Sequence, residues 1–370
     1  MRARIALLAT LLLVTACAQQ PDAGRPFAMG FTSWPYAFTD EAWAVTVAEV
    51  RAHGELITFH QDHGVPWWEA ATGTAYDPNV ETTLERQAAA RSGFRWVYVS
   101  ATPQNNDRRT LAGHWGARDH EPLPPEWAGR SFDDPEVISA YLNYLRRLVR
   151  TLEPDLLAYG IEVNAAYTPD DPRFAEFLAF CRKVYPVLKR EFPDLTVFLT
   201  FQTDSWEVGR TDQLEVTRRL LPYTDLIALS TYPYVTPEAV RRGSAEGLPP
   251  EGWLDVWAAL DPDKPLAVSE TGFAAEDLVI PAYGFDVRAT PGMQAAYVQR
   301  LLSDLERLKA RFVVWWEVRD YDEGYAFLKE HGLDDPALLI WKDIGLEDGR
   351  GRPRPALEVW DAWRARPLRP

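Results

Sequence analysis

Cysteine is scarce in this sequence: the 370 residues include two, Cys17 and Cys181. If Cys17 is modified, as its surroundings indicate, Cys181 has no partner for an intramolecular disulfide. Cys181 lies in the segment FAEFLAFCRKVYPVLKR, whose apolar residues recur at helical spacing. We therefore expect Cys181 to be a buried helix residue rather than a nucleophile.

Histidine is also scarce, with six residues. His60, Asp62 and His63 lie close together in FHQDHGVPWWEA and invite a metal interpretation. Metal-dependent barrels usually draw their ligands from several strand ends, so we favour a site without a metal and expect no cofactor. The other histidines stand without ligand spacing: His53, His114, His120 and His331.

Positive charge is outnumbered, since 39 Lys and Arg residues face 54 Asp and Glu residues and the net charge is −15. Such an acidic surface argues against nucleic acid or anionic lipid as a partner and fits a neutral substrate. The 15 tryptophans suit sugar binding, because indole stacks on the apolar faces of pyranose rings, although core packing will account for most of them.

The first sixteen residues resemble a signal peptide. MRAR is positively charged, and the apolar run IALLATLLLV is too short to cross a membrane as a helix. The segment VTAC resembles a bacterial lipobox, which implies cleavage before Cys17 and lipid attachment to its sulfur; ordinary secretory cleavage nearby is the alternative. With either cleavage we expect the protein to be exported, and lipid on Cys17 would anchor it in the bacterial cell envelope. We expect residues 1–16 to be the signal peptide, 17–26 a lipidated tether and 27–370 one domain.

Eight short apolar runs alternate with amphipathic helical stretches, which include 134–154 and 290–310. Strands that alternate with helices indicate parallel βαβ units, and eight of them predict a (β/α)8 TIM barrel. A doubly wound open sheet is the alternative, but the Gly-rich turn that it often carries is missing. We expect long loops after strands 3, 6, 7 and 8. The runs are 27–34, 55–62, 95–102, 156–164, 195–202, 225–234, 265–272 and 311–320.

Two predicted strands end in a glutamate. In such barrels the active site lies at the C-terminal ends of the strands. The fourth strand leads to Glu162, with Asn164 two residues on and so on the same face, and the seventh leads to Glu270. Two facing carboxylates are what glycoside hydrolysis uses. The alternative is that each glutamate is a rim residue in a salt bridge.

Several short motifs resemble glycoside hydrolase clan A, the retaining (β/α)8 glycosidases. Glutamates on strands 4 and 7 are that clan's signature, and SETGFA is similar to its strand-7 nucleophile segment. LSTYPY and GIEVN resemble the strand-6 and strand-4 segments of the arabinogalactan endo-β-1,4-galactanases, the nearest resemblance. The pair Trp315–Trp316 is similar to the clan's strand-8 tryptophan.

The resemblance implies roles for these residues. Glu162 would be the acid/base and Glu270 the nucleophile of a retaining reaction. Tyr232 would donate a hydrogen bond that keeps Glu270 ionised. One of Trp315 and Trp316 would form the floor of the subsite where the bond breaks.

One position departs from the clan. The residue before the acid/base is normally an asparagine that hydrogen-bonds the sugar 2-hydroxyl, and here it is Ile161. Such contacts strengthen in the transition state and supply several kcal/mol. Asn164 is a candidate substitute. A different sugar, or weak or absent activity, would also follow from Ile161.

The segment after strand 2 offers further binding residues. We expect His60 and Asp62 to grip sugar hydroxyls, with Trp67 or Trp68 stacking on the ring; a capped loop with packed tryptophans is the alternative. Trp115 and Trp127 in the strand-3 loop either supply further subsites or pin that loop to the barrel.

These features favour one function over two others. The leading hypothesis is a lipid-anchored, monomeric glycoside hydrolase that acts on a β-linked oligo- or polysaccharide. A carbohydrate-binding lipoprotein on a barrel that has lost catalysis is the rival, and Ile161 is the residue that supports it. A metal hydrolase is the third reading. The sugar and its linkage depend on loop shape, which the sequence does not give.

Overall fold

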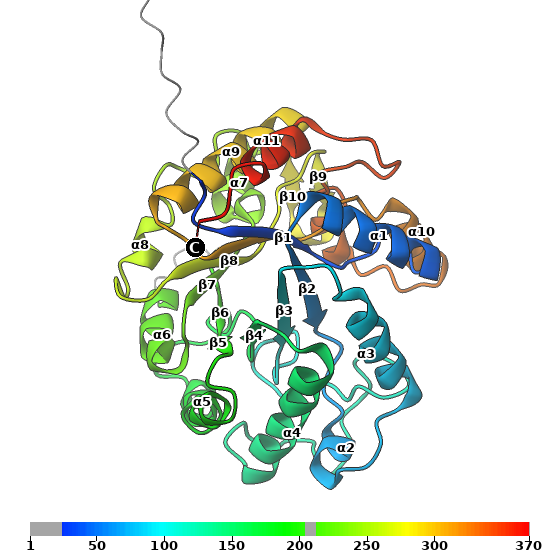
Figure 1. The fold of residues 1–370 in the computed structure, drawn as a ribbon, viewed down its shortest axis with the longest axis vertical. Helices are drawn as coiled ribbons and strands as arrows, with labels where there is room; N and C mark the ends of the chain where they lie inside the picture. Colours follow the sequence, from blue (N-terminus) through cyan, green and yellow to red (C-terminus); the bar gives the residue numbers. More distant parts are fainter. Residues whose placement is uncertain (1–23, 204–211, 370) are drawn as a thin grey trace, which may run out of the picture.

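Eight parallel strands close into a barrel in the computed structural model, which describes residues 24–203 and 212–369. The hydrogen-bonded order is β5-β4-β3-β2-β1-β11-β8-β7-β6. β5 and β6 are consecutive in the chain and only Leu199 separates them, so together they form the fifth barrel strand and close the ring (Figure 1). The predicted (β/α)8 barrel is confirmed, with every strand where the sequence places it.

Neighbouring barrel strands all run parallel. An antiparallel hairpin of β9 (Leu278–Ile280) and β10 (Phe285–Val287) lies outside the barrel, in the connection after β8. The barrel strands are β1 (Ala28–Thr32), β2 (Leu56–Gln61), β3 (Trp96–Ala101), β4 (Leu156–Ala158), β5 (Thr196–Phe198), β6 (Thr200–Gln202), β7 (Ile227–Thr231), β8 (Leu266–Thr271) and β11 (Phe312–Trp315).

Helices surround the barrel on its outside (Figure 1). The longer ones are α1 (Asp40–His53), α3 (Pro78–Ala90), α4 (Pro135–Leu152), α5 (Pro172–Glu191), α6 (Gln213–Leu220), α9 (Pro291–Arg307), α10 (Asp322–Glu330) and α11 (Pro355–Arg364). Shorter helical turns interrupt the connections: α2 (Trp67–Thr72), α7 (Pro237–Arg242) and α8 (Asp255–Ala258).

The two helices that the sequence predicts form within two or three residues of their expected ends, as α4 and α9. α9 begins as its sequence indicates: Thr290 Oγ1 accepts the backbone N–H of Met293 at 3.2 Å, and Pro291 occupies the first helical position. Cys181 is fully buried in α5, so its expected structural place is confirmed.

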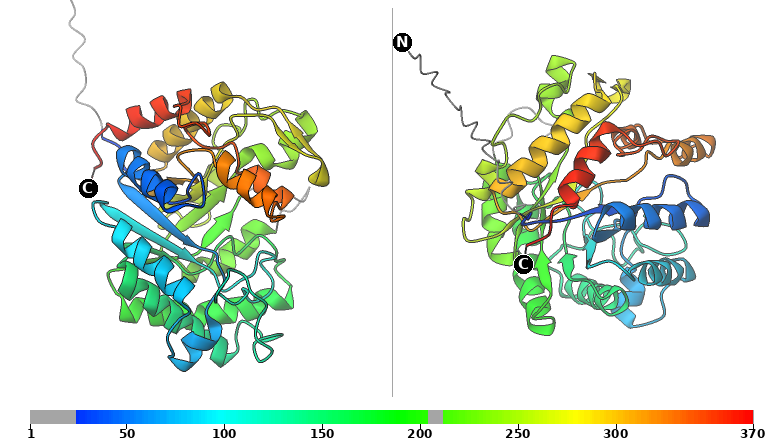
Figure 2. Two further views of the ribbon diagram at one scale, coloured as in Figure 1. Left: turned by 90° about the vertical axis from the view of Figure 1, so that its right-hand side faces the viewer. Right: turned by 45° about the horizontal axis from the view of Figure 1, so that its top comes forward.

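Four long connections follow the C-terminal ends of strands, after β3 (102–134), β7 (232–265), β8 (272–290) and β11 (316–354). These are the connections that the sequence predicts to be long. The left view of Figure 2 shows α10 and the β9–β10 hairpin at one end of the barrel and the C-terminal residues at the other. The long connections therefore lie at the end of the barrel where barrel enzymes have their active sites.

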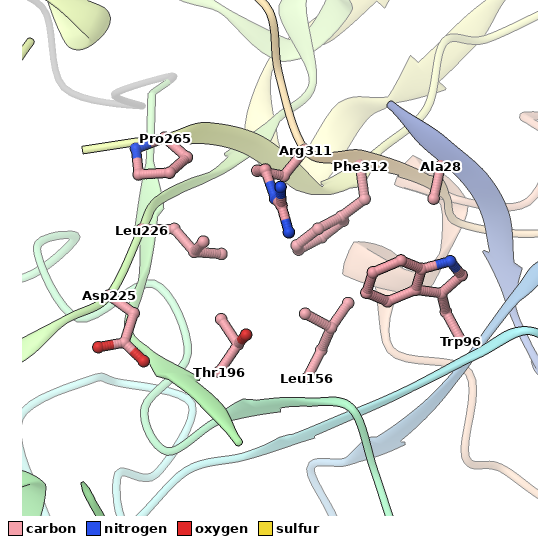
Figure 3. Close-up of a pocket in the computed structure, with 9 residues that line it drawn as sticks. All are labelled: Ala28, Trp96, Leu156, Thr196, Asp225, Leu226, Pro265, Arg311 and Phe312. Carbon is pink, nitrogen blue, oxygen red and sulfur yellow. The ribbon is translucent and has the colours of Figure 1, made fainter. Parts of the chain in front are cut away.

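The N-terminal mouth of the barrel is packed with side chains. Tyr98, Phe198 and Phe312 meet inside it, with ring centroids 5.3 to 5.9 Å apart. A cavity of about 210 Å³ remains at this mouth, and Figure 3 shows Leu156 and Trp96 pointing into it beside Phe312. In barrels of this kind the N-terminal face serves stability, so the functional site is sought at the other end.

Both ends of the described chain dock beneath the barrel. The Arg25 N–H donates to Pro367 O at 2.9 Å, and the Arg369 N–H donates to Arg25 O at 2.9 Å. Residues 24–26 thus belong to the folded body, although the sequence assigns them to a tether. The predicted signal peptide and Cys17 lie outside the described residues. Within the described parts of the chain, no helix combines the length and apolar character needed to span a membrane.

Arg25 anchors this arm through a buried ion pair, and its loss should destabilise the protein. Two of its nitrogens donate to Glu55 at 2.6 and 2.8 Å, and only 3% of the Arg25 side chain is exposed. Arg25→Ala would leave Glu55 without its main partner, and we expect the free energy of unfolding to fall by roughly 3 kcal/mol. Chemical denaturation measures this loss.

A surface pair with the same geometry provides the control. Arg146 donates twice to Glu191 at 2.7 Å, but both side chains are at least a quarter exposed. Arg146→Ala should therefore cost no more than about 1 kcal/mol. Equal losses in the free energy of unfolding for the two variants would show that burial of the Arg25–Glu55 pair does not increase its contribution to stability.

Candidate active site

A cleft of about 760 Å³ opens among the long connections at the C-terminal end of the barrel. Glu162 and Glu270 both line it, together with Ile161. The rest of its lining is Trp34, His60, Asp62, His63, Asn106, Asp107, Arg108, Asp119, His120, Ala165, Ala166, Gln202, Tyr232, Val235, Trp316, Tyr321, Asp335, Ala337, Leu338, Ile340 and Trp341.

Glu162 is placed by an irregular segment that follows β4. Its φ is +49°, a left-handed conformation that is uncommon outside glycine and tends to occur at functional sites. Its N–H donates to Thr200 Oγ1 at 2.8 Å. The carboxylate accepts a hydrogen bond from Ser230 Oγ at 2.7 Å and lies 3.4 Å from Arg108 Nη2.

Glu270 lies on β8, where the pairing with β7 shifts register and brings Ser230 opposite it. The Tyr232 hydroxyl donates to Glu270 Oε1 at 2.7 Å, so the hydrogen bond that the sequence predicts is present. Ser230, two residues before Tyr232, donates to Glu162. One strand end, that of β7, therefore holds both carboxylates.

Glu270 has a perturbed pKa in the shielded cleft. Burial and then the charge of Glu162 raise its pKa, the hydrogen bond from Tyr232 and the charge of Arg108 lower it, and the balance is a pKa of about 8. Glu270 therefore keeps its proton at neutral pH. The sequence predicts that Tyr232 keeps Glu270 ionised; in the structure, burial outweighs that hydrogen bond.

One wall of the cleft is polar and carries His60 and Asp62, as the sequence predicts. His60 Nδ1 lies 2.9 Å from Ser100 Oγ, and burial lowers the His60 pKa to about 4, so the imidazole is neutral. Asp62 lies 3.6 Å from Arg108 Nη1. Burial alone would raise the pKa of Asp62, but the charge of Arg108 is among the effects that lower it below its usual value, so Asp62 is ionised.

An aromatic group adjoins this polar wall, where the Trp316 ring lies 5.1 Å from the His60 ring. Trp316 lies at the centre of this group, with ring centroids 5.9 Å from Trp34 and 6.3 Å from Trp341. The Trp315 indole is fully buried and its Nε1 donates to Ile344 O at 2.8 Å. Trp316 is thus the tryptophan of the pair that a ligand can contact.

The predicted orientation of Asn164 is wrong. Its side chain is fully buried, donates to Gln202 O and Thr217 Oγ1, and accepts the N–H of Gln202. The expectation assumed strand alternation from Glu162 onwards, but β4 ends at Ala158 and the chain then bends. Asn164 therefore supports the next strand and does not face the cleft.

Neither tryptophan after β2 lines the cleft. The Trp67 side chain is buried, donates to Ala112 O at 2.8 Å and stacks on Trp127 at 5.4 Å. Trp68 is half exposed on the other side of α2, because successive residues of a helix point in different directions. Trp115 is also buried. The packed-loop alternative is what the structure contains.

Sequence reasoning missed Arg108, Trp34 and Trp341. Arg108 sits in the loop after β3, within NNDRRTLAG, where two consecutive arginines give no sign of which one turns inward. Trp34 ends the predicted run 27–34, two residues beyond the end of β1, and Trp341 comes from the connection after β11, which lacks a strand pattern. Long-range packing alone brings them to the cleft.

One acidic group away from the cleft has the spacing of a metal site among the described residues: Glu276, Asp320 and Asp343. Arg354 Nη2 lies 2.7 Å from Asp320 and 3.1 Å from Glu276. This guanidinium already supplies the positive charge that the carboxylates need.

Solved structures share this fold at low sequence identity. A GH5_18 protein from Bifidobacterium longum subsp. infantis has 13% identity and a TM-score of 0.63 over 93% of this chain and 80% of that chain. A GH53 catalytic domain from Ignisphaera aggregans has 17% identity and a TM-score of 0.56 over 92% of this chain and 98% of that one.

The exo-β-1,4-mannosidase Op5Man5 from Opitutaceae bacterium strain TAV5 has 16% identity and a TM-score of 0.59 over 93% of this chain. The match spans 60% of the length of that protein. A scan against protein-family models and a search of curated proteins gave no match. At such identities the likeness establishes the barrel fold.

The raised pKa of Glu270 predicts that this residue lowers stability in alkaline solution. Its pKa is about 8 in the folded protein against an ordinary 4.5. The burial of Glu270 therefore costs no stability below pH 4.5, where the residue is protonated in both the folded and the unfolded protein. The free energy of unfolding then falls as the pH rises from 4.5 to 8, and the loss is complete above pH 8. Glu270→Gln keeps the shape of the protonated form. By scanning calorimetry, we expect this variant to melt several degrees above the wild type at pH 9 and close to it at pH 5.

An exposed glutamate serves as the control for this measurement. Glu85 lies on the outer face of α3, so Glu85→Gln should track the wild type at both pH values. A Glu270→Gln variant that melts below the wild type at pH 9 would contradict the burial argument.

Proposed function

We propose that this protein is a glycoside hydrolase that cleaves a β-linked oligo- or polysaccharide with retention of configuration. The observation that carries the proposal is the shared support of the two glutamates: Ser230, on β7, and Tyr232, directly after it, hydrogen-bond Glu162 and Glu270 in one cleft. The fold agrees with it, since similar structures are described as a GH5_18 protein, a GH53 catalytic domain and an exo-β-1,4-mannosidase.

In the first step Glu270 acts as the nucleophile. Tyr232 holds Oε1 of Glu270, which leaves Oε2 to attack the anomeric carbon. The bond to the leaving oxygen breaks as Glu162 gives that oxygen a proton. A sugar with its apolar face on Trp316 presents the anomeric carbon between the two carboxylates.

In the second step water replaces the nucleophile. Glu162 removes a proton from the water, the water oxygen bonds to the anomeric carbon, and Glu270 leaves as a carboxylate. In each step one of the two carboxyl groups starts uncharged, because it carries a proton in the first step and the glycosyl group in the second. Burial and the charge of Glu162 favour an uncharged Glu270 at neutral pH.

The position of that proton is set by opposing contacts. Burial and the charge of Glu162 place it on Glu270. Tyr232 favours charge on Glu270, and the positive charge that develops at the anomeric carbon adds to this preference. Moving the proton to Glu162 leaves the total charge of the pair unchanged. The substrate therefore has to change only which of the two carboxylates carries the proton.

A binding protein without catalysis is the second candidate, and Ile161 is the residue that favours it. Ile161 lines the cleft next to Glu162 with an apolar side chain, so it offers the sugar no hydrogen bond. A protein that only binds sugar, however, has no need for two buried carboxylates whose mutual repulsion destabilises the fold. Their hydrogen-bonded support favours the enzyme.

Hydrolysis assays on a panel of polysaccharides and aryl β-glycosides test the proposal. Glu162→Gln should lose about 10²- to 10⁴-fold in kcat/KM, the usual contribution of a general acid. Glu270→Gln should lose at least as much, because it removes the nucleophile. Glu276→Gln, in the connection that follows β8 but outside the cleft, should retain activity.

Two outcomes would contradict the assignment. Equal hydrolysis by the wild type and Glu270→Gln would remove Glu270 from the mechanism, and sugar binding without hydrolysis would favour the second candidate. An activated 2-deoxy-2-fluoro glycoside separates the stereochemical alternatives. Mass spectrometry should locate a glycosyl adduct on Glu270, and an inverting enzyme would form none.

We further propose that the chain is exported and anchored to the cell envelope through lipid on Cys17, which the VTAC motif supports. Cys17→Ser should move the protein from the membrane fraction to the soluble fraction and abolish incorporation of labelled fatty acid. Cys181→Ala should keep both, because Cys181 is a buried helix residue. A Cys17→Ser protein that stays with the membrane would refute the anchor.

A further inference from the structure

Two polar atoms in the cleft are shielded from solvent and have no hydrogen-bond partner within the described residues: Asp62 Oδ1 and Arg108 Nη1. A shielded polar atom without a hydrogen-bond partner destabilises the folded protein. Both residues line the cleft. Such a cost is tolerated where the missing partner arrives with a ligand.

The two atoms belong to one arrangement beside Glu162. Arg108 Nη1 lies 3.6 Å from Asp62 Oδ2, and Arg108 Nη2 lies 3.4 Å from Glu162 Oε2. One guanidinium thus spans the two carboxylates. Its unsatisfied N–H is next to an unsatisfied carboxylate oxygen, a few ångströms from the proposed acid/base.

The loop after β3 is built to hold Arg108 in this place. Arg108 has a φ of +55°, a strained conformation for a side-chain-bearing residue. Its N–H donates to Asn105 O at 2.8 Å, and its carbonyl accepts from Gln104 Nε2 at 2.8 Å. The same Gln104 nitrogen lies 3.1 Å from the Tyr167 hydroxyl. The guanidinium is therefore preorganised.

The chemistry of the pair selects its partner. Arginine only donates hydrogen bonds and an ionised aspartate only accepts them. A hydroxyl does both and satisfies the two atoms at once. An anionic group would be repelled by Asp62 and Glu162, and a metal ion would be repelled by Arg108.

We propose that Asp62 and Arg108 bind the 2-hydroxyl of the sugar whose bond is cleaved, with Arg108 Nη1 donating to that hydroxyl and the hydroxyl donating to Asp62 Oδ1. This rests on the proposed function. The 2-hydroxyl is the hydroxyl next to the reacting carbon, so a guanidinium that touches Glu162 through one nitrogen reaches it through the other. The substrate is accordingly a neutral sugar with a free 2-hydroxyl.

The pair also accounts for the apolar residue at position 161. Ile161 leaves the sugar without a hydrogen bond from the fourth strand. Asp62 and Arg108 supply one from the connections after β2 and β3 instead. Because Asp62 is ionised, the hydrogen bond that it accepts strengthens as the 2-hydroxyl becomes more acidic beside the developing oxocarbenium ion.

Deoxy substrates test the inference. The probes are the 2,4-dinitrophenyl β-glycoside that the wild type hydrolyses fastest and its 2-deoxy and 3-deoxy forms. In all three the leaving group is dinitrophenol and not a second sugar. Asp62→Asn and Arg108→Lys should each lower kcat/KM about 10- to 100-fold on the parent substrate, mainly through kcat. On the 2-deoxy form the same substitutions should cost less than about 3-fold, and on the 3-deoxy form the full loss should persist.

Arg109→Lys is the matched control. Arg109 is the next residue of the same loop but turns outward to Ala166 O and Asp171, so its variant should resemble the wild type on all three substrates. Thermal unfolding of each variant verifies that it is folded.

Other outcomes overturn the inference. Equal losses on the parent and 2-deoxy substrates would make Asp62 and Arg108 structural, and a loss that disappears on the 3-deoxy form would assign them to another hydroxyl. Either result leaves the glycosidase proposal standing. A wild type that hydrolyses none of the substrates would overturn both.

Discussion

The mutual repulsion of two carboxylates in one shielded cleft is the constraint on which the site depends. Glu162 and Glu270 are held by hydroxyls from the end of a single strand, β7, and by a proton that burial keeps on the pair at neutral pH. Without these contacts two adjacent charges would have to be solvated, and the cleft would have to open to water. The barrel meets the constraint because its strands end together and its long connections enclose those ends.

The cleft combines an aromatic and a polar lining. Its aromatic wall, centred on Trp316, matches the apolar face of a sugar ring, and its polar wall, with Asp62 and Arg108, matches hydroxyls. The cleft is also strongly acidic, and the one arginine among its described lining residues, Arg108, is already engaged with Asp62 and Glu162. This arrangement suits a neutral carbohydrate, in keeping with the net charge of −15.

Many of the aromatic side chains serve the scaffold. Trp67 and Trp127 stack beneath the connections after β2 and β3, and Trp115 packs with His63 at 4.8 Å. These contacts fix the loops that carry Asp62 and Arg108. At the opposite mouth, Tyr98, Phe198 and Phe312 fill the barrel. Stability and function thus occupy separate ends of one barrel.

The sequence by itself determined the eight strands, the positions of Glu162 and Glu270 at strand ends, and Tyr232 as a partner of Glu270, because each of these follows from local periodicity or a short motif. Tertiary structure decided the rest. Asn164 turned away because the chain bends after Ala158, and Trp67 turned inward because α2 is helical. Arg108 reached Glu162 from 54 residues earlier in the chain. No local pattern encodes such a contact, because the path of a loop is fixed only when distant segments pack together. The same packing buries Glu270 and so raises its pKa.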